Sequence, residues 1–155
     1  MNPGDAGQPR DIRPAIRVKH PPFLHSRIPD QCRICGTVID RITVKRLGGD
    51  RIAIGGNSIG CQLSVISMIR LRDRHGLTPF VGANLLAGCY DLRLTPSVRS
   101  WGTEPLILNT RDMEMFVKLF LDNGGNPEDP DLSPIFADLK VLPRALGPVV
   151  TRDPL

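Results

Sequence analysis

The segment RIAIGGNSIGCQLSVISMIRLRDRHG, residues 51–76, constrains the fold of this chain most strongly. Its apolar start, residues 51–55, predicts a short strand buried on both faces of a parallel sheet. Residues 59–75 then predict a mostly apolar helix, and Gly76 can take the left-handed conformation that ends it. The turn GNSIG joins the two elements, with Ser58 at its apex. Glycine two residues to either side of a serine is typical of a turn in which strand and helix backbones crowd each other.

This layout is that of a nucleophile elbow, in which a strained turn exposes the serine hydroxyl. Gly56 and Gly60 would allow the close approach of strand and helix. The backbone N–H of Ile59 would point, with the helix N-terminus, at a developing oxyanion. Serine also needs a base to accept its proton and a carboxylate to orient that base. The pattern therefore favours Ser58 as a nucleophile over the plainer alternative of a Gly-Ser turn before a helix.

The rest of the chain predicts an α/β arrangement. Residues 80–88 are typical of a second central strand, and the intervening helix makes it parallel to the first through a right-handed crossover. Asn109 or Thr110 is expected to cap an amphipathic helix that ends near Gly124. Residues 145–151 predict a third strand, placed at an edge or distorted because it contains a proline.

Composition indicates one ordinary globular domain with a basic arm. The 155 residues are 41% hydrophobic and 23% charged, and the net charge of +4 is concentrated in residues 1–47. We expect that segment to be irregular and without a nucleic-acid partner, although DNA binding by it is a minor alternative. No run approaches the roughly 18 apolar residues of a membrane helix, and the N-terminus lacks the apolar stretch of a secretory signal. A cytoplasmic protein with no membrane span is expected.

The four cysteines are a weak signal. Cys32 and Cys35 form a lone C-x-x-C, whereas Cys61 and Cys89 fall in apolar segments, where cysteine usually behaves as a small hydrophobe. A zinc site needs a second pair of ligands at a suitable spacing. We therefore expect no metal and no cofactor.

Several ordered segments resemble one known family. They are GGDRIAIGGNSIG, LRDRHGLTPFVGANLLAGCYDL, the loop DPDLSPIFADL and the closing LPRALGPVVTRDPL. Together they are similar to the serine esterases and lipases of the α/β-hydrolase fold that are related to hormone-sensitive lipase. The resemblance implies a truncated α/β-hydrolase domain over residues 48–155. Its fold would be a parallel sheet with flanking helices and part of a cap region, residues 103–135.

The resemblance also assigns site residues. It implies Ser58 as the nucleophile, the Ile59 N–H as an oxyanion donor and Asp153 as the acid of a catalytic triad. The family's histidine follows the acid, but only two residues follow Asp153 here, and His75 is expected to be a helix-terminal cation. An HGGG-type loop with further oxyanion donors is missing too. We expect a carboxylic-ester hydrolase for small or lipid-like esters that is incomplete, and weak or inactive as this chain.

One alternative is a non-catalytic α/β-hydrolase remnant that binds a hydrophobic ligand or a protein partner. The apolar residues Trp101, Met113, Phe116 and Phe120 are candidates for an acyl pocket or for ordinary core packing. A parallel sheet that lacks its first strands would expose an apolar edge, so we also expect self-association.

Overall fold

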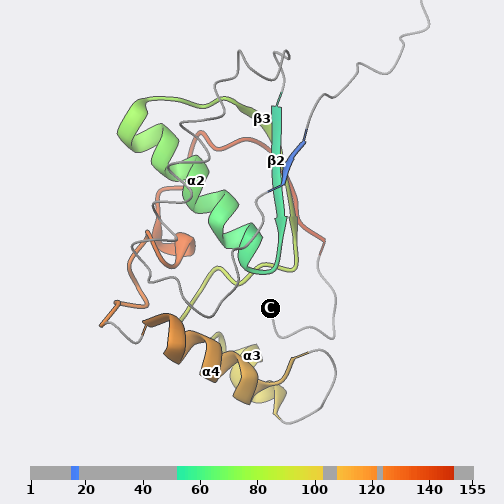
Figure 1. The fold of residues 1–155 in the computed structure, drawn as a ribbon, viewed down its shortest axis with the longest axis vertical. Helices are drawn as coiled ribbons and strands as arrows, with labels where there is room; N and C mark the ends of the chain where they lie inside the picture. Colours follow the sequence, from blue (N-terminus) through green and yellow to red (C-terminus); the bar gives the residue numbers. More distant parts are fainter. Residues whose placement is uncertain (1–14, 18–51, 103–107, 122–123, 149–155) are drawn as a thin grey trace, which may run out of the picture.

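The computed structural model describes residues 15–17, 52–102, 108–121 and 124–148. The Cys32/Cys35 motif and Asp153 lie outside these ranges. The described residues form an α/β structure in which one long helix lies against a parallel sheet and two further helices lie beyond the carboxyl ends of the strands (Figure 1).

The sheet has four described strands in the order β1-β2-β3-β4, and every neighbouring pair is parallel. The strands are β1 (Ala15–Arg17), β2 (Ile52–Asn57), β3 (Phe80–Leu86) and β4 (Ala145–Leu146). The parallel pairing of β2 with β3 confirms the prediction from sequence. β3 ends two residues before the predicted boundary because Ala87 adopts a positive φ of 49°, which no strand residue has.

β1 corrects the prediction that residues 1–47 are irregular throughout. Its three residues pair with Ala53 to Gly55 of β2, which places β2 inside the sheet. A strand of three residues is too short to produce a recognisable periodic pattern, so only its pairing reveals it.

Helix α2 (Ile59–His75) has the bounds predicted from its apolar pattern and lies along one face of the sheet (Figure 1). Gly76 has φ 64° and ψ 23°, and its N–H donates to the carbonyl of Arg72, which closes the helix. The core between α2 and the sheet consists of Ile54, Val65, Met68, Ile69 and Ala83.

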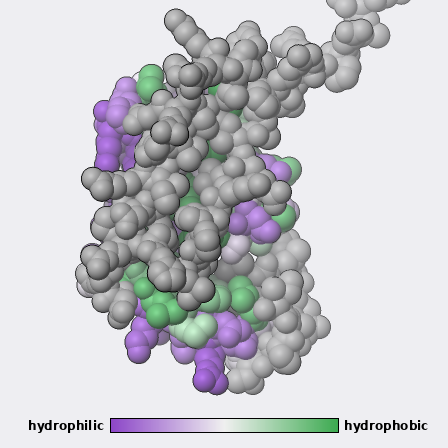
Figure 2. All heavy atoms as spheres, in the orientation of Figure 1, coloured by the Kyte–Doolittle hydropathy of each residue, from purple (hydrophilic) through white to green (hydrophobic). Residues whose placement is uncertain are grey.

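Helix α4 (Thr110–Leu121) begins at a reciprocal cap. The N–H of Asp112 donates to Oδ1 of Asn109 at 3.0 Å, and the N–H of Asn109 donates to Oδ2 of Asp112 at 3.2 Å. This confirms the predicted cap. In Figure 2 the surface over α4 has hydrophobic side chains toward the rest of the molecule and hydrophilic ones on its outer rim, as expected for an amphipathic helix.

Helix α3 (Pro96–Trp101) was not predicted. Six residues are too few to display a helical period, although Pro96 in the first turn is a common start. The hydroxyl of Thr110 donates to the carbonyl of Val98 at 2.7 Å, and α3 thereby packs against the start of α4.

The loop before the short helix η2 (Pro134–Phe136) docks against α2. The Arg70 guanidinium binds the Asp131 carboxylate at 2.8 Å, and the Gln62 amide donates to the carbonyl of Leu132. The guanidinium of Arg70 holds the pKa of Asp131 below its ordinary value. These contacts attach a segment distant in sequence to the helix that follows Ser58.

Candidate active site

Ser58 joins β2 to α2 with a backbone conformation that residues other than glycine rarely adopt. Its φ is 54° and its ψ is −123°, and such a conformation costs on the order of 1–3 kcal/mol. The Ser58 N–H donates to the carbonyl of Leu86 at 3.0 Å, which ties the turn to the end of β3. The hydroxyl forms no capping hydrogen bond to α2. The fold therefore holds a strained serine whose hydroxyl is not used by the helix that it precedes.

Gly56 lies where β2 and α2 come closest. A Cβ at this position would lie 2.2 Å from the carbonyl carbon of Gly60 and 2.7 Å from the backbone nitrogen of Cys61. Both are backbone atoms, so a side chain here would require movement of the helix. This contact is the physical reason for glycine at position 56.

Ile59 is the first residue of α2, directly after Ser58. The first four N–H groups of a helix have no acceptor within it, and the helix dipole makes that end positive. The first turn of α2 also has no acidic residue. The start of α2 is thus able to stabilise negative charge beside Ser58.

Cys61 and Tyr90 pack beneath the turn. The Cys61 thiol is fully buried, with Sγ 3.1 Å from the carbonyl oxygens of both Gly56 and Leu86. Burial raises the pKa of the Cys61 thiol and of the Tyr90 phenol, because it removes their charged forms from water. At neutral pH both groups are uncharged, and Cys61 joins the ends of β2 and β3.

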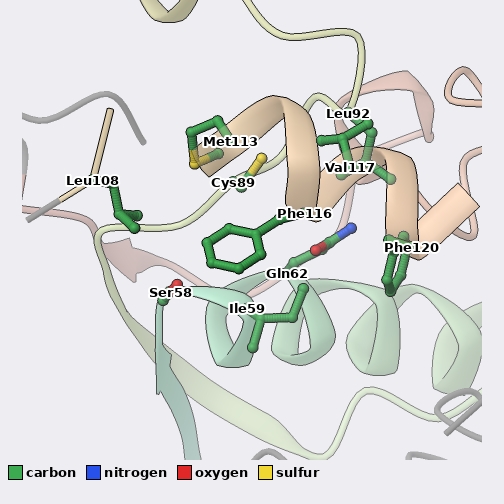
Figure 3. A pocket seen from close by; sticks show the side chains of 10 residues that line it. All are labelled: Ser58, Ile59, Gln62, Cys89, Leu92, Leu108, Met113, Phe116, Val117 and Phe120. Carbon is green, nitrogen blue, oxygen red and sulfur yellow. The ribbon is translucent and has the colours of Figure 1, made fainter. Parts of the chain in front are cut away.

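A pocket of about 100 Å³ opens beside Ser58 (Figure 3). It is lined by Ser58, Ile59, Gln62, Cys89, Leu92, Leu108, Met113, Phe116, Val117 and Phe120. Figure 3 shows the α4 side chains facing the start of α2 across this space. Of the four apolar candidates from the sequence, Met113, Phe116 and Phe120 line the pocket, whereas Trp101 is outside its lining.

Residues 25–155 match a family profile described as the alpha/beta hydrolase fold. The chain belongs to the α/β-hydrolase fold family. The match begins at residue 25, ahead of the boundary at Gly48 that the sequence motifs predict. The partial α/β-hydrolase fold expected from those motifs is confirmed.

Three α/β-hydrolase relatives show which branch the chain resembles. An esterase of Acinetobacter venetianus is 28% identical over 139 residues, which cover 89% of this chain and 46% of that protein. The solved hyperthermophilic esterase of Pyrobaculum calidifontis is 31% identical, with a TM-score of 0.64 over 82% of this chain and 42% of that one. A hormone-sensitive lipase from a metagenome library is 28% identical, with a TM-score of 0.66 over 74% of this chain and 38% of that one. The predicted esterase and lipase relationship is confirmed, and the chain spans less than half the length of these relatives.

A serine hydrolase of this family needs a base near its serine. Among the residues that the structure describes, His75 is the only histidine. It ends α2, whereas Ser58 precedes the first residue of that helix. Seventeen residues at a rise of 1.5 Å separate them by about 25 Å along the helix axis. His75 therefore cannot accept a proton from Ser58 of the same molecule, and Asp153, the predicted acid, lies outside the described residues.

Gln62 is a pocket residue that the sequence motifs did not indicate. It is fully buried and lies one helical turn after Ser58, on the same side of α2. The spacing of four residues from Ser58, which places both residues on one side of the helix, is the signal that points to it. Cys89 also lines the pocket, which the sequence did not predict, and burial raises the pKa of its thiol.

Two further findings concern the described ranges only. None of their helices is long and apolar enough to cross a membrane. Nor do they bring three or more His, Cys, Asp or Glu residues together in a way that fits a metal ion.

Proposed function

We propose that this chain carries the nucleophilic part of a serine carboxylic-ester hydrolase, with Ser58 as the nucleophile. The observation that carries the proposal is the positive φ of Ser58, in a strand–turn–helix beside an apolar pocket. The esterases to which the chain is similar support the same reaction.

In the proposed reaction the Ser58 oxygen attacks the ester carbonyl and the serine proton passes to a base. The Ile59 N–H stabilises the oxyanion until the alcohol departs with a proton, and water then releases the acid from the acyl-enzyme. Asp153 would orient the histidine that accepts the serine proton. His75 is too far from Ser58 to serve as the base, and a hydrolase without its base retains about 10³–10⁴-fold catalysis over water. Turnover by the described residues alone is therefore expected to be slow.

Release of p-nitrophenol from p-nitrophenyl butyrate, with and without added imidazole, tests the proposal. Imidazole is a base of the kind that a catalytic histidine provides, and the rate is expected to rise with its concentration. Ser58→Ala should reduce the rate to that of imidazole alone, whereas Ser100→Ala, at an exposed serine of α3, should leave it unchanged. Equal rates for the chain and for Ser58→Ala would refute the proposal.

The apolar lining of the pocket favours a second function, binding of a hydrophobic ligand without catalysis. The two functions differ in one measurement. A chain that binds small apolar ketones, yet shows no Ser58-dependent release of p-nitrophenol, has the second function.

The cytoplasmic location, the absence of a nucleic-acid partner and self-association are also proposals. Support for self-association comes from β4, the last described strand, in which both residues are exposed and Leu146 is 67% exposed. Sedimentation should show a mass that grows with concentration, and a monomer at every concentration would contradict it.

Cell fractionation tests the cytoplasmic location. Salt-sensitive DNA binding that is lost on deletion of residues 1–47 would contradict the absence of a nucleic-acid partner.

A further inference from the structure

Gln62 lines the pocket beside Ser58, and its side-chain amide has an unpaired acceptor, Oε1. Its side chain is fully buried, and its Nε2 donates to the carbonyl of Leu132. Because that carbonyl can only accept a hydrogen bond, Nε2 must face it, and Oε1 therefore points away from Leu132. Oε1 is buried and has no hydrogen-bond partner within the described structure.

An amide oxygen that has lost water without gaining a donor is unfavourable, and buried polar groups in proteins are nearly always paired. The remaining lining is mostly apolar, and its side-chain polar groups are the Ser58 hydroxyl and the Cys89 thiol. The thiol is directed to the carbonyl of Asp91, with Sγ 3.8 Å from that oxygen. In Figure 3 the Gln62 amide lies between the start of α2 and the apolar side chains of α4. A donor on a bound ligand would satisfy Oε1.

We propose that Gln62 selects esters whose pocket-bound substituent carries a hydrogen-bond donor, such as a hydroxyl or an amide N–H. The identity of the ligand as an ester rests on the proposed function. Ser58 and Gln62 are four residues apart, about 6 Å along the helix. That spacing suits a hydroxyl on the third or fourth carbon, counted from the carbonyl that Ser58 would attack.

The size of the pocket narrows the substrate further. An apolar cavity of about 150 Å³ holds a benzene molecule. The pocket here is about 100 Å³, so it fits a substituent of roughly four carbons. Short hydroxyacyl groups meet both conditions, whereas an unsubstituted fatty acyl chain lacks the hydrogen-bond donor.

Two ketones of the same shape test the proposal on the unmodified chain. 4-Hydroxypentan-2-one has a hydroxyl where 4-methylpentan-2-one has a methyl, and neither can be hydrolysed. Dissociation constants from ligand-detected NMR should show the hydroxy ketone binding about threefold tighter or better. Tighter binding of the methyl ketone, or binding of neither, would overturn the proposal.

Gln62→Met keeps the length of the side chain and removes the acceptor. It should reverse the preference and change the ratio of the two dissociation constants by about tenfold. Val117→Ala alters the same pocket without touching the amide, and should weaken both ketones while keeping their order. A Gln62→Met chain that melts cooperatively and keeps the preference for the hydroxyl would also overturn the proposal.

The ketone experiment is independent of catalysis because binding needs no reactive serine. A hydroxyl preference that depends on Gln62, together with no Ser58-dependent turnover, would refute only the proposed hydrolase function. Conversely, turnover that depends on Ser58 but a pocket indifferent to the hydroxyl would refute only the role of Gln62.

Discussion

The carbonyl oxygen of Gly60 lies 2.3 Å from the point that a Cβ of residue 56 would occupy. The end of β2 and the first turn of α2 therefore touch through their backbones. The chain can reverse in so small a space only because Ser58 takes a positive φ between them. The strain at the serine and the absence of a side chain at position 56 are two consequences of one contact.

Gly56→Ala is expected to destabilise the fold by about 3 kcal/mol or more, because the new methyl group would overlap backbone atoms of α2. Urea unfolding measures the change. Gly82→Ala is the matched control in the neighbouring strand, since its Cβ would meet only the Arg144 carbonyl oxygen at 3.6 Å, an ordinary contact. Equal losses of stability in the two variants would show that the crowding at position 56 is unimportant.

Ser58→Gly is expected to raise the free energy of unfolding by about 1 kcal/mol, because glycine adopts a positive φ without strain. The gain is smaller than the strain itself, since glycine also increases the entropy of the unfolded chain. Ser58→Ala keeps the strained Cβ and serves as the control. If both variants have the same stability in urea, the turn holds no strain of this kind.

Stability should fall as the pH rises above about 9, in part through Cys61. The ordinary thiol pKa is 9.0, and burial raises that of Cys61 in the folded state. Above pH 9 the unfolded chain loses this proton while the folded chain keeps it, so the free energy of unfolding decreases with pH. In Cys61→Ala the decrease should be shallower, with no difference in slope below pH 8. Parallel curves from pH 7 to 10 would contradict the role of the buried thiol.

Asp131→Asn is expected to destabilise the fold by about 1 kcal/mol at pH 7, because it removes the charge that binds Arg70. The pKa of Asp131 is lowered from 3.8, so its stabilisation is complete above pH 3.8 and is lost as the pH falls through the lower folded value. Urea unfolding should show the two chains converging under acid conditions. Asp73→Asn, in an exposed pair with the adjacent Arg72, should have a smaller effect.

The elements with long, self-contained patterns were predictable from the sequence. Residues 59–75 have an apolar pattern with a glycine after it, and the helix has those bounds. The period of α4 likewise indicates which of its side chains share a face, and Met113, Phe116 and Phe120 do face one space. β1 and α3 were missed because three and six residues carry too little pattern.

In the candidate site, too, the local feature was predictable and the long-range one was not. The turn around Ser58 was identified from five adjacent residues, because backbone crowding at a strand-to-helix reversal is a local steric demand. The place of Gln62 was not identified. Its amide meets the carbonyl of Leu132, 70 residues further along the chain, and only that contact directs Oε1 away from the loop.

The order of residues alone determined the strand, the turn and the helix, since each depends on neighbours within one or two turns of backbone. It also determined the family, because several separate segments match that family in order. Tertiary packing decided what lies opposite Ser58: α4 closing over an apolar pocket, His75 about 25 Å away, and an amide oxygen of Gln62 left without a donor. Contacts between distant segments depend on how whole elements dock, and no short pattern encodes that geometry.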